Sequence, residues 1–515
     1  MKPLPVVCIL STICIGFSIF VSFGTKESRV VHSQVQVQLD PQCTLPSTWL
    51  PSTPPPNEMD VPKPEPSTDC AFYRPAWQRF MVATQPMDNT GKPTFLSYPS
   101  FEDIFFDPSG ANTQKKLLHP EALTLSLMPR NVERANEPSG RHQELLDITQ
   151  AAIGNQTGGA LIDQKGHFIY YAIHVDPYMQ MFLRLNNLTT APGISQSGDA
   201  LAFQNLQPPF LHSVTEFKSA WMIVDNEHAA PNYYVAQASV PRYIIGADGL
   251  LTTELQPNGQ PVTKPVWVAL IALHVAFTLP GHPEMIWSTF EHVHPNPDGS
   301  VERDNAPAAT SNPSDPPATG IQTVSEKGYP YPLYKAHTLA NQANLAIVDP
   351  KQMAADWDVK QQLFKRAGAV VQTSVYRPYP ASKSDPTQSE DDEVVGINAS
   401  ANQLFNDPKA TVFKHDKRRN YRLVGATWLD QPSQTFAKGK AFDGAIVAGE
   451  DRLGSTAMES FTESPNSAPN CFSCHDTRKV PLKGSALPAK PLNVSHLLSK
   501  YLIQSGQGVV APAPQ

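Results

Sequence analysis

The sequence predicts an α+β fold with a strand-rich central domain and a C-terminal segment of helices and loops. Apolar and aromatic runs of strand length recur from about residue 158 to residue 430. Helical spacing of apolar residues occurs near residue 70 and again near the C-terminus. The 51 prolines, against 28 glycines, favour fixed turns and extended connections over long helices.

The first 24 residues have the pattern of an export signal. Lys2 precedes an apolar run over residues 6–23, the small residues Ser22 and Gly24 suit a signal peptidase, and polar sequence follows. The run also approaches the minimum length of a membrane span, so an uncleaved anchor is the alternative. We therefore expect an exported protein that contacts the membrane only if this segment stays attached.

Residues 25–69 are expected to form an extended arm, because their many prolines disfavour a helix or a central strand. An α+β core domain is predicted to follow over residues 70–450. In an exported protein, Cys43 and Cys70 are candidates for a disulfide that ties the arm to this domain. Two unpaired thiols are the alternative.

The core domain should begin with a helix over residues 70–86, since Phe72, Trp77 and Phe80 can share one helical face. Residues 158–175 suit a hairpin with a turn at Gly166. Residues 266–278 are apolar nearly throughout, as in a strand buried on both faces. Further strands are predicted over residues 214–225, 233–240, 284–293 and 421–430, and a helix is predicted over residues 351–370.

The most specific motif lies in the segment 451–505, ahead of a tail, 506–515, that we expect to be disordered. It is Cys471-Phe472-Ser473-Cys474-His475, which matches the c-type haem attachment pattern. Residues three apart on one helical turn face the same way, so both thiols can form thioethers with one porphyrin. His475 is then placed to be the proximal iron ligand. The motif thus predicts one covalently bound haem c.

Other cysteine chemistry fits this motif less well. A zinc site with Cys471, Cys474 and His496 lacks an evident fourth ligand. A redox-active dithiol is disfavoured because Pro465 and Pro469 crowd the approach to the motif, where a strand should lead into a helix. A structural disulfide between the two cysteines is the remaining alternative.

The second axial ligand of the iron is left open by the sequence. Met458 lies upstream of the motif on a plausible short helix, and we expect it to be the ligand. His496 lies downstream on an amphipathic stretch and is the alternative. Two possibilities remain for the second axial position: a histidine of the central strands, His274 or His292, or an iron that is open to a small ligand. Arg478 and Lys479 follow the motif and are candidates to neutralise the haem propionates, solvent exposure being the other possibility.

The charge balance and the missing motifs argue against several classes of function. The net charge of −7 disfavours a general nucleic-acid binder, and no nucleic acid is expected as a partner. The common sequence motifs of serine hydrolases, P-loop NTPases and nicotinamide enzymes do not occur.

Several stretches together resemble a known group of proteins. They are "CAFYRPAWQRFMVATQP", "GGALIDQKGHFIYYAIHV", "YRLVGATWLDQP" and "STAMESFTESPNSAPNCFSCH", and the resemblance covers most of residues 70–480. The chain is similar here to large exported bacterial cytochrome c family proteins with a single C-terminal haem-attachment motif. The resemblance implies covalent haem on Cys471 and Cys474, His475 as ligand and a periplasmic location. It implies no substrate.

These observations predict a periplasmic c-type cytochrome that transfers single electrons between redox partner proteins. The first alternative is a haem-dependent oxidoreductase that acts on a substrate at the large α+β domain, because this domain is larger than an electron carrier needs. A non-catalytic haem sensor or binding module is the second alternative.

Overall fold

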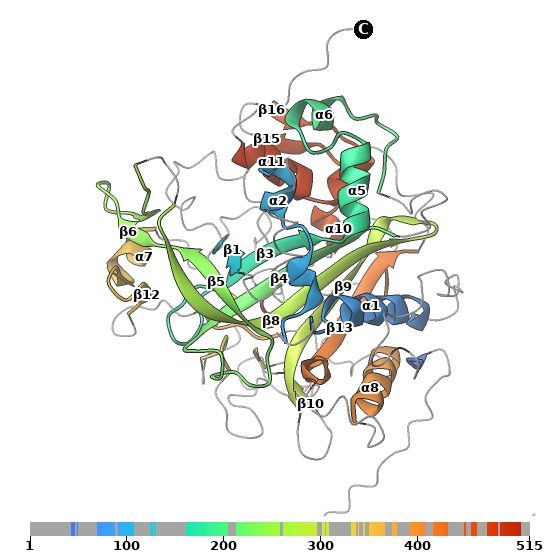
Figure 1. Cartoon of the computed structure of the whole chain (residues 1–515), viewed down its shortest axis with the longest axis horizontal. Helices are drawn as coiled ribbons and strands as arrows, with labels where there is room; N and C mark the ends of the chain where they lie inside the picture. The colour runs from blue at the N-terminus through green and yellow to red at the C-terminus, as the bar shows by residue number, and fades with distance from the viewer. Residues whose placement is uncertain are drawn as a thin grey trace, which may run out of the picture. The chain divides into compact units, whose positions relative to one another are not determined.

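A large, almost entirely antiparallel sheet forms the centre of the described part of the chain, and the predicted α+β class is confirmed (Figure 1). The structure is a computed structural model. The residues that it describes are 43–46, 49, 69–87, 91–107, 124–126, 128–129, 161–203, 213–257, 261–295, 301–303, 305–307, 331–335, 338, 343–345, 350–365, 373–377, 392–406, 416–430, 447–449, 455–460, 471–482 and 485–505.

The strands of the sheet pair in the order β14-β13-β9-β8-β4-β3-β2. Strand β10 pairs with β9, β5 pairs with β8, and β1 runs parallel to β5. The strands in question are β1 (Thr124–Ser126), β2 (Met128–Pro129), β3 (Tyr170–Val175), β4 (Thr215–Val224), β5 (Val235–Pro241), β8 (Thr263–Leu279), β9 (His282–Pro295), β10 (Val301–Arg303), β13 (Tyr421–Leu429) and β14 (Val447–Gly449).

Shorter elements surround the sheet. Three small hairpins pair β6 (Tyr243–Ile245) with β7 (Leu251–Thr253), β11 (Trp357–Asp358) with β12 (Leu363–Phe364), and β15 (Val480–Leu482) with β16 (Ser485–Leu487). The helices are α1 (Cys70–Ala83), α2 (Phe101–Phe105), α5 (Pro177–Leu185), α6 (Ala191–Gln196), α7 (Pro350–Asp356), α8 (Asp392–Asn406), α10 (Cys471–Cys474) and α11 (Leu497–Gln504), with 3-10 turns η5 (Thr94–Ser97), η10 (Lys417–Asn420) and η11 (Pro491–Val494).

Helix α1 covers one face of the sheet, as its apolar spacing predicted, and α8 lies beside it (Figure 1). Phe80 stacks on Phe290 of β9 with ring centroids 4.2 Å apart, and Trp77 meets the same ring edge-on at 5.1 Å. Aromatic pairs of this kind contribute about 0.5–1.5 kcal/mol each beyond their burial. Aromatic side chains therefore fill the interface between α1 and this face of the sheet.

Strand β8 is buried over most of its length, and the prediction for residues 266–278 is confirmed. Every residue from Val268 to Leu279 is buried except His274. Strand β8 pairs with β4, β5 and β9, so its backbone polar groups are satisfied within the sheet.

Burial of a carboxyl group at the β8–β9 hairpin gives a testable pH dependence. Glu284 is fully buried, it accepts hydrogen bonds from His282 and from the Leu429 N–H, and burial raises its pKa above 4.5. A raised folded-state pKa means that the folded protein binds this proton more tightly than the unfolded chain does. The stability contributed by Glu284 is thus present at low pH and is lost as pH rises through the folded-state pKa.

We expect the free energy of unfolding of wild type, relative to Glu284→Gln, to decrease from about pH 4 to pH 7, because glutamine does not titrate. Urea unfolding of both proteins across this range measures the difference. Glu227→Gln is the control, since the Glu227 side chain is 54% exposed. If the difference in the free energy of unfolding between wild type and Glu284→Gln stays constant with pH, ionisation of the Glu284 carboxyl group is not coupled to folding.

Two sequence predictions are only partly correct. Within the predicted hairpin over residues 158–175, Ile162 bridges to Phe168 around a turn at Gly166, and the regular strand begins at Tyr170. Residues 158–160 of this prediction lie outside the described residues. Gly166 has φ +91°, and a side chain here would collide with the Phe364 carbonyl, so the turn requires glycine.

The predicted helix over residues 351–370 is wrong from Trp357 to Lys365, and residues 366–370 lie outside the described residues. The chain leaves α7 after Asp356 and forms the β11–β12 hairpin, in which Trp357 pairs with Phe364. The Asp358 carboxylate accepts hydrogen bonds from the backbone N–H groups of Lys360 and Gln361. An aspartate that bonds its following N–H groups competes with the helix and favours a turn.

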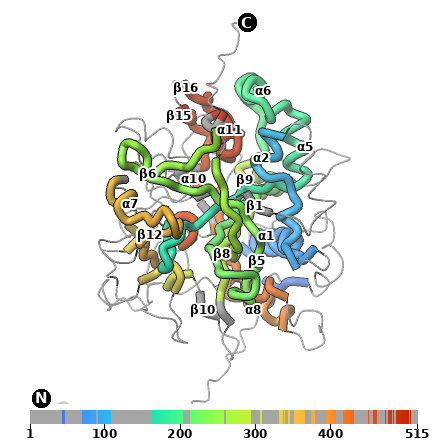
Figure 2. Tube along the Cα trace, turned by 60° about the vertical axis from the view of Figure 1, so that its left-hand side comes forward, coloured from blue at the N-terminus to red at the C-terminus, as the bar shows by residue number. Residues whose placement is uncertain are grey.

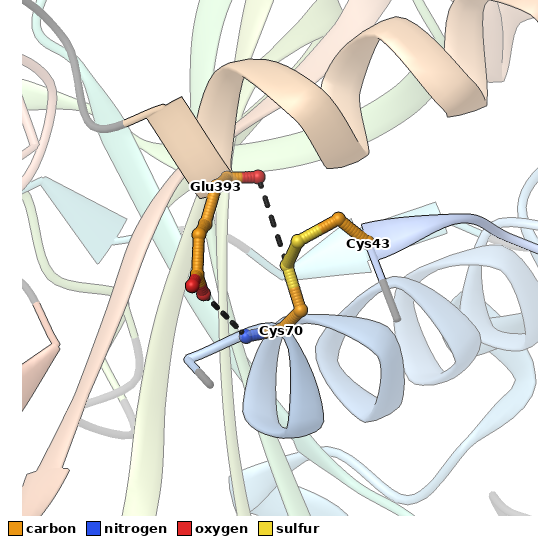
Figure 3. A group of neighbouring side chains, drawn as sticks. All are labelled: Cys43, Cys70 and Glu393. Carbon is orange, nitrogen blue, oxygen red and sulfur yellow. Dashed lines mark hydrogen bonds between the residues drawn. A yellow bond between two sulfur atoms is a disulfide. The ribbon is translucent and has the colours of Figure 1, made fainter. Parts of the chain in front are cut away.

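The predicted disulfide between Cys43 and Cys70 is confirmed (Figure 3). Glu393 of α8 lies beside it, and its side chain accepts a hydrogen bond of 2.9 Å from the Cys70 N–H at the start of α1. The Leu45 N–H donates to Ser400 Oγ, 2.8 Å away, on the same helix. These contacts tie the described part of the arm to α1 and α8. The predicted signal, the rest of the arm and the tail lie outside the described residues.

Candidate functional site

The face of the sheet opposite α1 carries three rows of side chains. Because side chains alternate along a strand, residues paired across neighbouring strands share a face and form such rows. The first row is Tyr171, Ala220, Ala272, Glu291 and Arg422; the second is Ile173, Lys218, His274 and Thr289; the third is Val175, Glu216, Ala276, Trp287 and Thr427.

The second row contains a hydrogen-bonded polar group. His274 Nε2 lies 2.9 and 3.0 Å from the two carboxylate oxygens of Glu459, and His274 Nδ1 lies 2.8 Å from Thr289 Oγ1. Burial by itself raises the pKa of Glu459, but His274, Lys218 and the Ser455 N–H outweigh it and the pKa is lowered. Glu459 is therefore ionised at neutral pH, and His274 Nε2 carries a proton that it donates to this carboxylate.

A turn over residues 455–460 places Glu459 on this face. The Thr456 N–H and hydroxyl both donate to Glu291 Oε1, at 2.8 and 3.2 Å, and Arg377 donates to the same oxygen at 2.8 Å. The Tyr171 hydroxyl donates to the Ala457 carbonyl, 2.7 Å away. The turn that precedes the cysteine motif is thus held to the sheet by buried polar contacts.

The motif itself forms one helical turn, α10, as its spacing predicts. The His475 N–H donates to the Cys471 carbonyl at 2.9 Å, so the turn continues to the histidine. Phe472 is buried in the apolar cluster that also contains residues of α5, α6 and α11. Figures 1 and 2 show α10 and α11, together with β15 and β16, at the end of the sheet where α5 and α6 lie.

The imidazole of His475 is buried and oriented. Its Nδ1 lies 2.8 Å from the Val494 carbonyl, which can only accept, so Nδ1 carries the proton and Nε2 has the lone pair. Trp287 of the third row packs against the ring with centroids 3.9 Å apart. Burial, followed by the nearby His496, lowers the pKa of His475 well below 6.5. The ring is therefore neutral at neutral pH, which is the form that binds a metal.

His496, the alternative axial ligand, is the predicted site residue that the structure brings against His475. The two rings stack with centroids 4.1 Å apart and an interplanar angle of 18°. The two rings therefore lie face to face, and His496 packs against the imidazole of His475. Its role as a ligand stays a prediction.

Met458, the other predicted axial ligand, lies in a different cluster. Its side chain is fully buried in the apolar core that includes Ala220 and Ala272 of the first row. The ring of His475 instead contacts the third row through Trp287. Ligation by Met458 requires this side chain to leave the core. The second axial ligand stays a prediction.

The remaining candidates occupy two different settings. His292 is fully buried, and its ring stacks on Tyr233 at 3.4 Å. Arg478 forms an ion pair with Asp476 and is exposed, as is Lys479. These two cations therefore face solvent, which was the alternative to a role at the propionates.

Apart from His274, the polar second row and its neighbour Glu216 were not predicted from the sequence. Glu216 is buried, accepts a hydrogen bond of 2.7 Å from the hydroxyl of Ser495, and has a pKa raised by burial. A usable signal was the spacing of Glu216 and Lys218 inside an otherwise apolar strand, since alternate charged residues lie on one face. Their contact with the C-terminal segment could not be read from that spacing.

Comparison with protein-family models, with curated proteins and with solved structures found no match to this chain. Among the described residues, none of the helices combines the length and the apolar character needed to cross a membrane.

Proposed function

We propose that the protein is a periplasmic c-type cytochrome that holds one covalent haem and passes single electrons between redox partner proteins. The observation that carries this proposal is the arrangement of the motif. One helical turn presents Cys471 and leads directly into His475, whose Nδ1 is held by the Val494 carbonyl. Histidines that bind a metal usually donate their other ring N–H in this way.

The residues present suit haem as a cofactor. Cys471 and Cys474 supply the two thioethers, and His475 Nε2 supplies the proximal ligand. The Val494 carbonyl fixes the tautomer and, with Trp287, fixes the ring plane of His475. Haem bound here supplies one-electron exchange. The chain around it excludes water, since Phe472, Leu497 and Leu498 are buried beside the motif.

The test is spectroscopy of the exported protein, produced together with a c-type haem maturation system. We expect a haem-staining band after denaturing electrophoresis and a haem that is reversibly reduced and reoxidised. Haem that stays bound but does not cycle between the two states at biological potentials would contradict the electron-transfer role. Protein that lacks haem altogether would contradict the proposal that haem is the cofactor.

A haem-dependent oxidoreductase is the second candidate, and one observation favours it. The pair His274 and Glu459 is only partly covered, with 14% and 25% of the side-chain surfaces exposed, although His274 lies on a central strand of the sheet. A hydrogen-bonded base beside a redox centre suits proton-coupled chemistry. Carbon monoxide separates the candidates: rapid binding to the reduced protein indicates an open iron and favours the enzyme or a sensor, and no binding favours electron transfer.

A further inference from the structure

We propose that Lys218 is the cation that raises the reduction potential of the haem held by the C-terminal motif. This inference rests on the proposed function, because it concerns the environment of that haem. It assigns a role to a residue of the central sheet, more than 250 positions away from the motif in the sequence.

Lys218 occupies an unusual place for a lysine. It lies near the middle of β4, paired with Ile173 of β3 on one side and with His274 of β8 on the other. Ile173, Lys218 and His274 are each partly covered, whereas their strand neighbours on the opposite face of the sheet are buried. The three side chains therefore form a partly exposed patch on the face that the C-terminal segment covers.

Fixed polar groups of the C-terminal segment surround this patch. Glu459 binds His274, the direct neighbour of Lys218 in the second row. Glu216, two residues before Lys218 on the same face, accepts the hydroxyl hydrogen bond of Ser495. Ser495 directly precedes His496, whose ring stacks on His475. Glu216, Ser495 and His496 thus connect the neighbourhood of Lys218 on β4 to the proximal histidine.

Electrostatics agree with this geometry. Lys218 is among the charges that act on Glu216, which lies two residues away on the same face of β4. The same positive charge also disfavours ferric iron relative to ferrous iron, because the ferric form has one more positive charge. A cation at this place therefore raises the reduction potential.

The experiment compares potentiometric titrations of the haem-loaded full-length protein in wild type and Lys218→Met. We expect the ratio of reduced to oxidised haem at a fixed applied potential to fall about threefold in the variant. This change corresponds to about 30 mV for a one-electron couple. Lys218→Arg keeps the charge and is expected to restore the wild-type ratio. Lys360→Met removes an exposed lysine from the β11–β12 turn and is expected to change nothing.

Lys218→Gln is measured in parallel, because its amide can still hydrogen-bond carboxylates if Lys218→Met does not fold. A fall in the ratio in either neutral variant, reversed in Lys218→Arg, supports the proposal. Haem that is bound and has the wild-type potential in both neutral variants overturns it and leaves the proposed function standing. Wild-type protein without haem overturns the proposed function and this inference with it.

Discussion

Replacing both Cys471 and Cys474 with alanine is expected to abolish haem that survives denaturation. The thioethers are the only covalent links that the motif offers, and alanine has no sulfur to form them. His475 alone contributes one coordination bond, which does not persist in a denaturing gel. Haem staining of the exported variant beside wild type, at equal protein load, measures the loss. We expect no detectable signal in the double variant.

Two further variants sharpen this test. Ser473→Ala changes one of the two residues between the cysteines and should keep full staining, since serine forms no thioether. His475→Ala should leave the cysteines able to react but should change the optical spectrum, because the imidazole that Val494 orients is gone. If the double alanine variant stains at the wild-type level, the haem is attached to the protein at another position.

The second large effect concerns stability. Removing the disulfide by Cys43→Ala/Cys70→Ala is expected to lower the free energy of unfolding by about 3.5 kcal/mol. The bond closes a loop with a sequence separation of 27 residues, and the chain-entropy model gives this magnitude for such a loop. Urea unfolding followed by tryptophan fluorescence measures the difference, with Trp77 of α1 fully buried as one reporter.

A reductant provides the matched control for this prediction. Wild type unfolded in the presence of a strong reductant should approach the stability of the double variant, whereas the variant itself should not respond. Glu393→Gln keeps the disulfide and weakens the hydrogen bond to the Cys70 N–H, so a smaller loss is expected from it. If oxidised wild type and Cys43→Ala/Cys70→Ala have the same free energy of unfolding, the disulfide does not stabilise the protein as expected.

Much of the sheet could be predicted because its strands have a strong local signal. The apolar run over residues 266–278 and the stretch 421–430 both correspond to central strands, β8 and β13. The disulfide could also be predicted, since a pair of cysteines in a chain that is expected to be exported is usually oxidised. The predicted helix over residues 351–370 failed because a buried pair, Trp357 and Phe364, together with the Asp358 turn, outweighed its local helical pattern.

The surroundings of the motif could not be predicted, because they depend on pairing register and on distant contacts. The motif by itself indicated Cys471, Cys474 and His475. That Val494 holds the imidazole, that Trp287 packs against it and that Glu216 bonds to Ser495 follows only from the folded chain. Lys218 had no signal of its own beyond its spacing from Glu216, and its neighbours come from three other parts of the sequence.

The order of the elements along the chain has a consequence for biogenesis. Strands β3, β4, β8 and β9 are synthesised well before residues 455–460, 471–482 and 485–502, which cover their polar face. During synthesis this face and its charged groups therefore stay open to solvent until the last part of the chain arrives. In the proposed cytochrome, an enzyme that attaches the porphyrin would meet the cysteines on a segment that has not yet docked, and docking would then close over the finished product.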